Sequence, residues 1–239
     1  MKEGKKREKE WVMKLWMKKN KKQILLGIAA TLILLLLLAV LCIVLFTHNH
    51  QTYLTLKKCL NDMEVSEDMT ELVVPGNRCN DEDITVLDFS QFTGLKKIVV
   101  GDGCFENVRE LKLVGLGELK SVVIGVGCFS NKSGAFYLKE CPLVKELRVG
   151  NGAFKSYGSC VIESTPSLEV LTIGSSCFDN ANSLVLNGVA KLKSVVVGEG
   201  SFTQKSGRFS LSHCSAVKEL RIGDGSFTGF TSFTVTKTP

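Results

Sequence analysis

The chain has 239 residues and a formal net charge of +6, but this charge is unevenly spread. Residues 1–22 contain ten Lys or Arg against three Glu, whereas the residues after Lys22 hold 20 basic and 21 acidic side chains. Because a nucleic-acid-binding surface needs an excess of basic groups to neutralise phosphates, the composition after Lys22 argues against that class of function.

An uncharged apolar run, residues 24–46, follows the basic segment. A helix of that length exceeds the roughly 30 Å hydrocarbon thickness of a bilayer, so residues 23–46 are expected to form one transmembrane signal-anchor helix. The alternative, a cleaved signal peptide, has a shorter apolar region that ends in a small-x-small site. Lysines crowd the N-terminal flank, so the positive-inside rule places a basic tail, 1–22, in the cytosol and the remaining chain outside the cell or in a lumen.

A repeated frame recurs six times, and its first copy opens at Leu95. It consists of Leu or Val, two residues, an aliphatic residue, one residue, Val or Ile, and then usually Gly-x-Gly-x-Phe. Its six copies end at Phe105, Phe129, Phe154, Phe178, Phe202 and Phe227, so the spacings by subtraction are 24, 25, 24, 24 and 25 residues. A fixed period in this range predicts a stacked-repeat array. A degenerate coil precedes these copies, with Pro75 in place of Gly and Cys79 in place of Phe, and residues 47–68 are expected to form a stalk and N-terminal cap.

Each repeat has a second half. Apolar or small residues recur eight, six and three positions before the opening Leu or Val, so each coil holds two short segments with the alternation of strands. The fold class expected is therefore mainly β, a right-handed solenoid of 24–25-residue coils over residues 69–239. Gly-x-Gly supplies a corner where positive φ is cheap for glycine, and the following Phe fills the coil interior.

Three coils have been duplicated as a block. Residues 120–154 and 193–227 align without a gap at an offset of 73 residues and share 21 of 35 positions. On that offset the chain stops partway through a further coil. Truncation of a larger repeat protein and an open end covered by a partner or a second copy both account for this, because natural arrays normally cap their ends.

The segments Cys141-Pro-Leu-Val-Lys-Glu-Leu-Arg-Val149 and Cys214-Ser-Ala-Val-Lys-Glu-Leu-Arg-Ile222 resemble leucine-rich repeats. The frame is similar to the BspA-like class of surface leucine-rich repeats over about residues 69–235. That resemblance implies a scaffold that binds proteins or host surfaces. The chain departs from the class in two ways: its Phe precedes the second strand, and Gly replaces the usual Pro except at Pro75.

The cysteines favour buried thiols over chemistry. Cys104, Cys128 and Cys177 share a repeat position with Ala153 and Ser201. That position therefore requires only a small side chain, and a free cysteine can fill it. There is no C-x-x-C pair, so no zinc site is expected, and Cys59 with Cys79 is the one pair put forward as a disulfide. Many free thiols fit poorly with an oxidising exterior. Asn131-Lys132-Ser133 is the single N-glycosylation sequon.

No catalytic pattern is found, so the chain is expected not to be an enzyme and to need no cofactor or metal. His48, His50 and His213 have no nucleophile frame beside them, and the Gly-x-Gly turns are not followed by a helix pattern. Binding is expected on outward-facing strand positions instead. The candidate ligand face comprises two columns of such positions. Val123, Arg148, Thr172, Val196 and Arg221 belong to one strand of each coil, and Tyr137, Val161 and Val185 belong to the other. The alternative is that Val and Thr are there for strand propensity alone.

These patterns together predict a single-pass, membrane-anchored recognition or adhesion protein at a cell surface or in a lumen, with a protein or glycan as ligand. Two alternatives stay open. One is a structural surface protein that self-associates through its C-terminal end. The other is a truncated paralogue of a larger repeat receptor.

Overall fold

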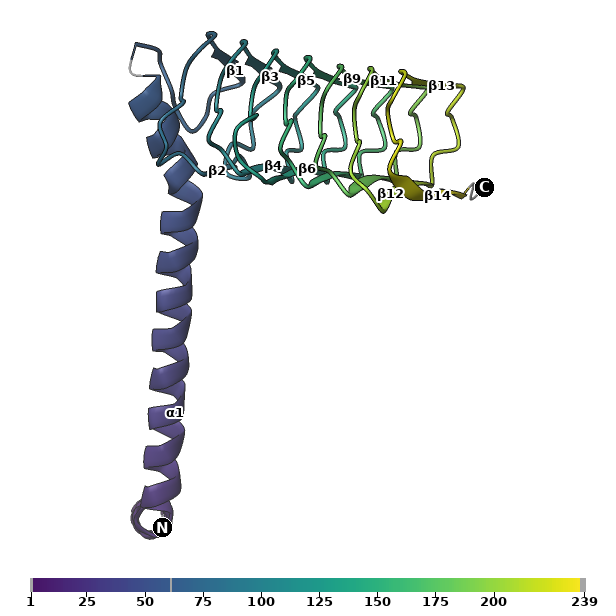
Figure 1. Ribbon diagram of the computed structural model, residues 1–239. Helices are drawn as coiled ribbons and strands as arrows, with labels where there is room; N and C mark the ends of the chain where they lie inside the picture. The colour runs from purple at the N-terminus through teal and green to yellow at the C-terminus, as the bar shows by residue number, and fades with distance from the viewer. Residues whose placement is uncertain (1, 61, 237–239) are drawn as a thin grey trace. The chain divides into compact units, whose positions relative to one another are not determined.

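The computed structural model describes residues 2–60 and 62–236. The chain divides into two compact units, Met1–His48 and Asn49–Pro239. One helix, α1 (Lys2–Cys59), makes up the described part of the first unit and continues into the second. The second unit holds the strands, which form a stack of coils (Figure 1).

The expected transmembrane segment, residues 23–46, lies within α1. Over the part of the chain that the structure describes, no helix is long and apolar enough to cross a membrane, so this expectation is not confirmed. The side chains of residues 21–25, 27–29 and 42–50 lie outside the described set.

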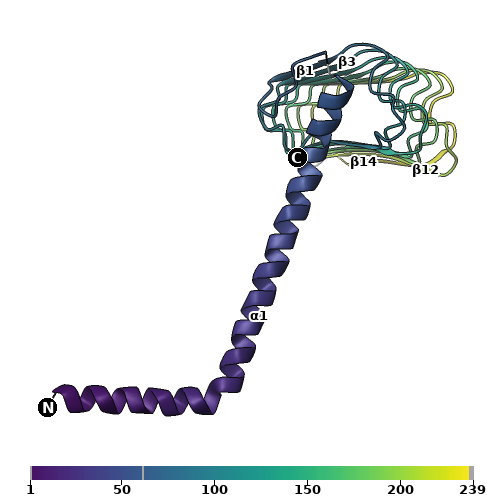
Figure 2. The ribbon, with the colours of Figure 1, turned by 90° about the vertical axis from the view of Figure 1, so that its left-hand side faces the viewer.

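The predicted β-solenoid with two strands per coil is confirmed, and its strands form two parallel sheets. Sheet A consists of β1 (Glu71–Val74), β3 (Lys97–Val100), β5 (Ser121–Ile124), β7 (Glu146–Val149), β9 (Val170–Ile173), β11 (Ser194–Val197) and β13 (Glu219–Ile222). Sheet B consists of β2 (Val86–Asp88), β4 (Glu110–Val114), β6 (Ala135–Lys139), β8 (Ser159–Glu163), β10 (Ser183–Asn187), β12 (Gly207–Ser212) and β14 (Phe230–Thr236). Figure 2 shows the two sheets on opposite sides of the coils.

The strand register follows the repeat length. Ser121 pairs with Glu146, and Glu146 pairs with Val170, which are offsets of 25 and 24 residues by subtraction. Like positions therefore stack on one another, so that the inward column Val122, Leu147 and Leu171 is at most 1% exposed. Burying such columns is what holds a one-dimensional stack together. Residues 237–239 of the predicted solenoid lie outside the described residues.

The corner after most sheet A strands, such as β7, contains two glycines that are needed for different reasons. A Cβ at Gly150 would lie 2.6 Å from the carbonyl carbon of Gly125 in the preceding coil, so the first glycine allows the coils to approach closely. The second, Gly152, has a left-handed φ of 67°. The predicted positive φ at the corner is thus confirmed at the second glycine, whereas close approach explains the first.

The Phe of the frame is also left-handed, which the repeat pattern did not predict. φ is 55° at Phe154 and 57° at Phe202, a conformation that costs a non-glycine residue roughly 1–2 kcal/mol. The rings offset this cost because they stack along the coil interior, with neighbouring centroids 4.8–5.4 Å apart. The expectation that these rings fill the coils is confirmed.

One buried threonine interrupts an otherwise apolar column. Thr165 is 0% exposed, and its hydroxyl has no hydrogen-bond partner, while Cys141 and Val189 hold the same place in the adjacent coils. Leaving a buried hydroxyl unsatisfied costs about 1–3 kcal/mol, and valine has nearly the same shape without the hydroxyl. Thr165→Val should therefore raise the free energy of unfolding by about 1 kcal/mol. Urea denaturation followed by far-UV circular dichroism measures this, with Val189→Thr as the reverse control, and a Thr165→Val protein less stable than wild type would contradict it.

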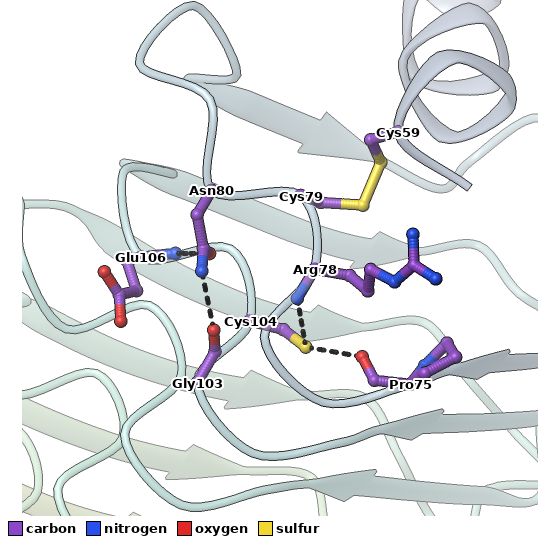
Figure 3. The surroundings of a disulfide bond; sticks show 8 residues. All are labelled: Cys59, Pro75, Arg78, Cys79, Asn80, Gly103, Cys104 and Glu106. Carbon is purple, nitrogen blue, oxygen red and sulfur yellow. Dashed lines mark hydrogen bonds between the residues drawn. A yellow bond between two sulfur atoms is a disulfide. The ribbon is translucent and has the colours of Figure 1, made fainter. Parts of the chain in front are cut away.

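The N-terminal end of the solenoid is covered by the last turns of α1. Leu56 and Leu60 are 0% exposed and belong to the continuous core, and the Thr52 hydroxyl accepts a hydrogen bond of 2.8 Å from the Asp88 amide. A disulfide joins Cys59, the last residue of α1, to Cys79 in the first coil, across a Cα–Cα distance of 5.1 Å (Figure 3). The residues expected to form a stalk and cap thus include a helical segment that packs on the first coil.

The disulfide closes a loop with a sequence separation of 20 residues. Crosslinks of this size stabilise a fold by about 3 kcal/mol because they restrict the unfolded chain. We expect Cys59→Ser/Cys79→Ser to lose about that free energy of unfolding. Adding a reductant should bring the wild-type midpoint down to that of the variant and leave the variant unchanged. A wild-type midpoint insensitive to reductant would show that the bond contributes no stability.

Candidate functional site

The eight residues of the candidate ligand face belong to two different sheets. Five of them align in register along the outside of sheet A: Val123, Arg148, Thr172, Val196 and Arg221. The other three align along sheet B: Tyr137, Val161 and Val185. The two predicted columns therefore belong to different sheets, which lie on opposite sides of the coils (Figure 2). We call the outer surface of sheet A the A face.

The A face carries the same polar cluster twice. The Ser121 hydroxyl donates to Glu146 at 2.9 Å, and the Arg148 guanidinium lies 3.1 Å from the other oxygen of that carboxylate. Three coils further on, Ser194 donates to the Glu219 carboxylate at 2.7 Å, and Arg221 lies 2.6 Å from its second oxygen. The block duplication seen in the sequence therefore repeats a Ser–Glu–Arg cluster along the stack.

Both clusters hold their carboxylates charged. The hydrogen bond from Ser121, followed by the interaction with Arg148, lowers the pKa of Glu146 below its ordinary value. Ser194 and then Arg221 lower the pKa of Glu219 in the same way. The two arginines keep donors exposed beyond these contacts, since the side chains of Arg148 and Arg221 are 52% and 73% exposed. They are the groups of each cluster that can reach a ligand.

A shallow groove lies beside the first cluster, where three strands of sheet A begin. Its volume is about 410 Å³, and it is lined by Lys120, Ser121, Lys145, Glu146, Glu169 and Val170. Lys193 pairs with Glu169 and lowers the pKa of its carboxyl group. The acidic groups of the groove are thus engaged with partners inside the protein.

The outer surface of sheet B is electrically balanced. Lys112 pairs with Glu110 at 3.2 Å, and Lys139 pairs with Glu163 at 2.9 Å. The Lys139 ammonium also lies 5.2 Å from the centre of the Tyr137 ring. Tyr137 is half-buried, and its ring contacts a neighbouring side chain of the same sheet. The arginines of the A face are thus more exposed than the paired lysines on the outer surface of sheet B.

Among the repeat cysteines whose side chains the structure describes, Cys104, Cys128, Cys141, Cys160, Cys177 and Cys214 are free and buried. Burial raises the pKa of the Cys141 thiol to about 11 and that of Cys177 to about 12. A hydrogen bond with Cys128 lowers the pKa of Cys104 to about 7, but both side chains are 0% exposed. The Cys104 thiol lies 3.0 Å from the Pro75 carbonyl and 3.4 Å from the Arg78 amide (Figure 3). Such enclosed thiols act as packing groups between coils.

Asn131, the sequon residue, is exposed in the loop between Phe129 and β6. Its side-chain amide donates to Glu106 at 3.0 Å. Among the described residues, His, Cys, Asp and Glu side chains form no group able to hold a metal ion. His213 is exposed with its ring nitrogen 3.1 Å from Asn187, and the side chains of His48 and His50 lie outside the described residues.

Reasoning from the sequence missed Ser121, Glu146, Ser194 and Glu219. A usable signal was present, since the run Val-Lys-Glu-Leu-Arg occurs at both 144–148 and 217–221. Pairing each glutamate with a serine required the strand register, which brings residues from neighbouring coils side by side.

No family model, curated protein or solved structure matches this chain.

Proposed function

We propose that this chain is a non-enzymatic recognition scaffold that binds a protein or glycan ligand on its A face. The observation that carries the proposal is the duplicated Ser–Glu–Arg cluster, which presents Arg148 and Arg221 on the same face of one sheet. Arginine is among the residues enriched at binding hot spots. Solenoids bind through extended surfaces of this kind, and the resemblance to BspA-like leucine-rich repeats supports the same conclusion.

The ligand-binding face is tested with the full-length chain on an array of glycans and purified extracellular proteins. For any ligand captured, Arg148→Ala/Arg221→Ala should weaken binding by about tenfold or more, because two exposed donors are removed from the A face. Tyr137→Ala on sheet B is the matched control and should leave the affinity within about twofold. Capture that depends on Tyr137 and not on the two arginines would move the site to sheet B, and a chain that captures nothing would refute the proposal.

We further propose that residues 23–46 anchor the chain in a membrane with the basic tail in the cytosol. The support is the uncharged 23-residue run and the lysines on its N-terminal side. The test is protease protection in intact microsomes, with Asn131→Gln compared for loss of a glycan mobility shift. Protected repeats with glycan on Asn131 support this orientation. Digestion of the repeats from the cytosolic side refutes it.

Self-association is a second candidate function, favoured by apolar groups at the last described coil. Leu220 and Ile222 are each 45% exposed, and Phe233 and Val235 are 57% and 63% exposed, although their counterparts in the preceding coil are buried. Exposed apolar groups that gather on one part of a surface mark association sites. Sedimentation of the full-length chain in detergent should then show a concentration-dependent dimer that Phe233→Glu abolishes. A monomer at all concentrations removes this candidate.

A further inference from the structure

We infer that the ligand of the A face is an anionic polysaccharide. It binds along a row of lysines that crosses sheet A just before its strands begin. This inference rests on the proposed function and names its ligand class. The row, here called the lysine row, has one residue in each coil from the second onward: Lys96, Lys120, Lys145, Glu169, Lys193 and Lys218.

Backbone hydrogen bonds fix the lysine row in space. Each member's amide donates to the carbonyl of the preceding member, from Lys120 to Lys218, at 2.8–2.9 Å. Neighbouring members are therefore one strand spacing apart, about 4.8 Å, and the whole row extends over roughly 24 Å. All five lysines are exposed. The groove lined by Lys120 and Lys145 lies at its middle.

The row concentrates positive charge in a repeat region that otherwise lacks it. The row contains five lysines and one glutamate, a net charge of +4. All residues after Lys22 together carry a net charge of −1, so those outside the row carry −5 by subtraction. Like charges on adjacent strands are destabilising. Within the described chain, Lys193 is the member whose ammonium pairs with an acid, Glu169, and Lys96, Lys120, Lys145 and Lys218 form no salt bridge. Sheet B lysines, by contrast, pair with glutamates.

A regular polymer matches this geometry better than other anions. The charges of the lysine row recur at the strand spacing, which is about the length of one sugar unit in an extended polysaccharide. The Ser–Glu–Arg clusters recur every three coils, about 14 Å. Both repeats run along one axis of the stack (Figure 1). Single-stranded nucleic acid is recognised by stacking bases on aromatic side chains, and the row contains none. The surrounding negative charge opposes a broad surface such as duplex DNA or an anionic bilayer.

The experiment measures binding of the full-length chain, in nonionic detergent at physiological salt, to heparin (sulfated) and to polygalacturonate (carboxylated). The test variant is Lys120→Gln/Lys145→Gln/Lys193→Gln. The control, Lys132→Gln/Lys155→Gln/Lys205→Gln, removes the same charge from corner loops, and both retain the basic tail. The test variant should bind at least about tenfold more weakly, while the control stays within about twofold. The three arginine substitutions at the test positions should restore binding, and melting curves confirm that all variants are folded.

Loss with both polymers would assign a carboxylate-bearing glycan, and loss with heparin alone a sulfated one; either supports the inference. Equal loss in test and control variants, or loss in neither, would overturn it. So would a row dependence seen only with duplex DNA or phosphatidylserine vesicles. A chain that still captures a neutral glycan or protein through Arg148 and Arg221 would then retain the proposed function without this ligand class.

Discussion

Replacing Phe154 by alanine should cost about 4 kcal/mol in the free energy of unfolding, among the largest losses for any single side chain here. The Phe154 ring is 0% exposed and stacks on Phe129 and Phe178, with centroid distances of 4.8 and 5.1 Å. It also makes an edge-to-face contact with Tyr157, with the ring centroids 4.9 Å apart. Deleting it leaves a cavity in the middle of the stack that the rigid coils cannot close. Alanine would also keep the left-handed φ of 55° without the packing that offsets it.

The matched control is Phe233→Ala, because Phe233 lies on the last coil and is 57% exposed. Its loss should be about 1 kcal/mol or less, since little apolar surface leaves a buried environment. Urea denaturation of the full-length chain, followed by far-UV circular dichroism, compares the two. Equal destabilisation by both substitutions would mean that the Phe stack is not the centre of stability.

Gly134→Ala should destabilise the protein by about 3 kcal/mol or more, despite adding a single methyl group. The added Cβ would lie closer to the Arg109 carbonyl oxygen of the preceding coil than any real contact allows. That oxygen already accepts the Ala135 amide at 2.8 Å, so it cannot retreat without breaking the ladder at the start of β6. The clash is with backbone atoms, which cannot move aside by a change of rotamer as a side chain could.

Gly117→Ala is the control for this prediction, because nothing lies within 4 Å of its added Cβ. An exposed, unhindered glycine of this kind should tolerate alanine to within about 0.5 kcal/mol. The same denaturation measurement applies, and soluble yield gives a second readout if Gly134→Ala does not fold. A Gly134→Ala protein as stable as Gly117→Ala would show that neighbouring coils can separate without loss.

The repeat alone determined the architecture. The period of 24 and 25 residues predicted a stack in which like side chains lie over one another. The apolar alternation in the two halves of each repeat predicted two strands per coil, and the recurring Phe predicted what fills the coil interior. The repeat also marked the Gly-x-Gly corners. These features are local: each follows from residues within one coil and from the need of each coil to bury its apolar side against the next.

What a ligand would meet was decided by the tertiary structure. Tyr137 and Arg148 are outward residues eleven positions apart, and only the fold of the coil places them on opposite sheets. The partnership of Ser121 with Glu146 depends on register between coils, as does the alignment of the lysines into a row. Periodicity fixes which side chains point outward, but their grouping depends on where the chain turns. That turn is set by the left-handed Phe and glycine corners acting together across the stack.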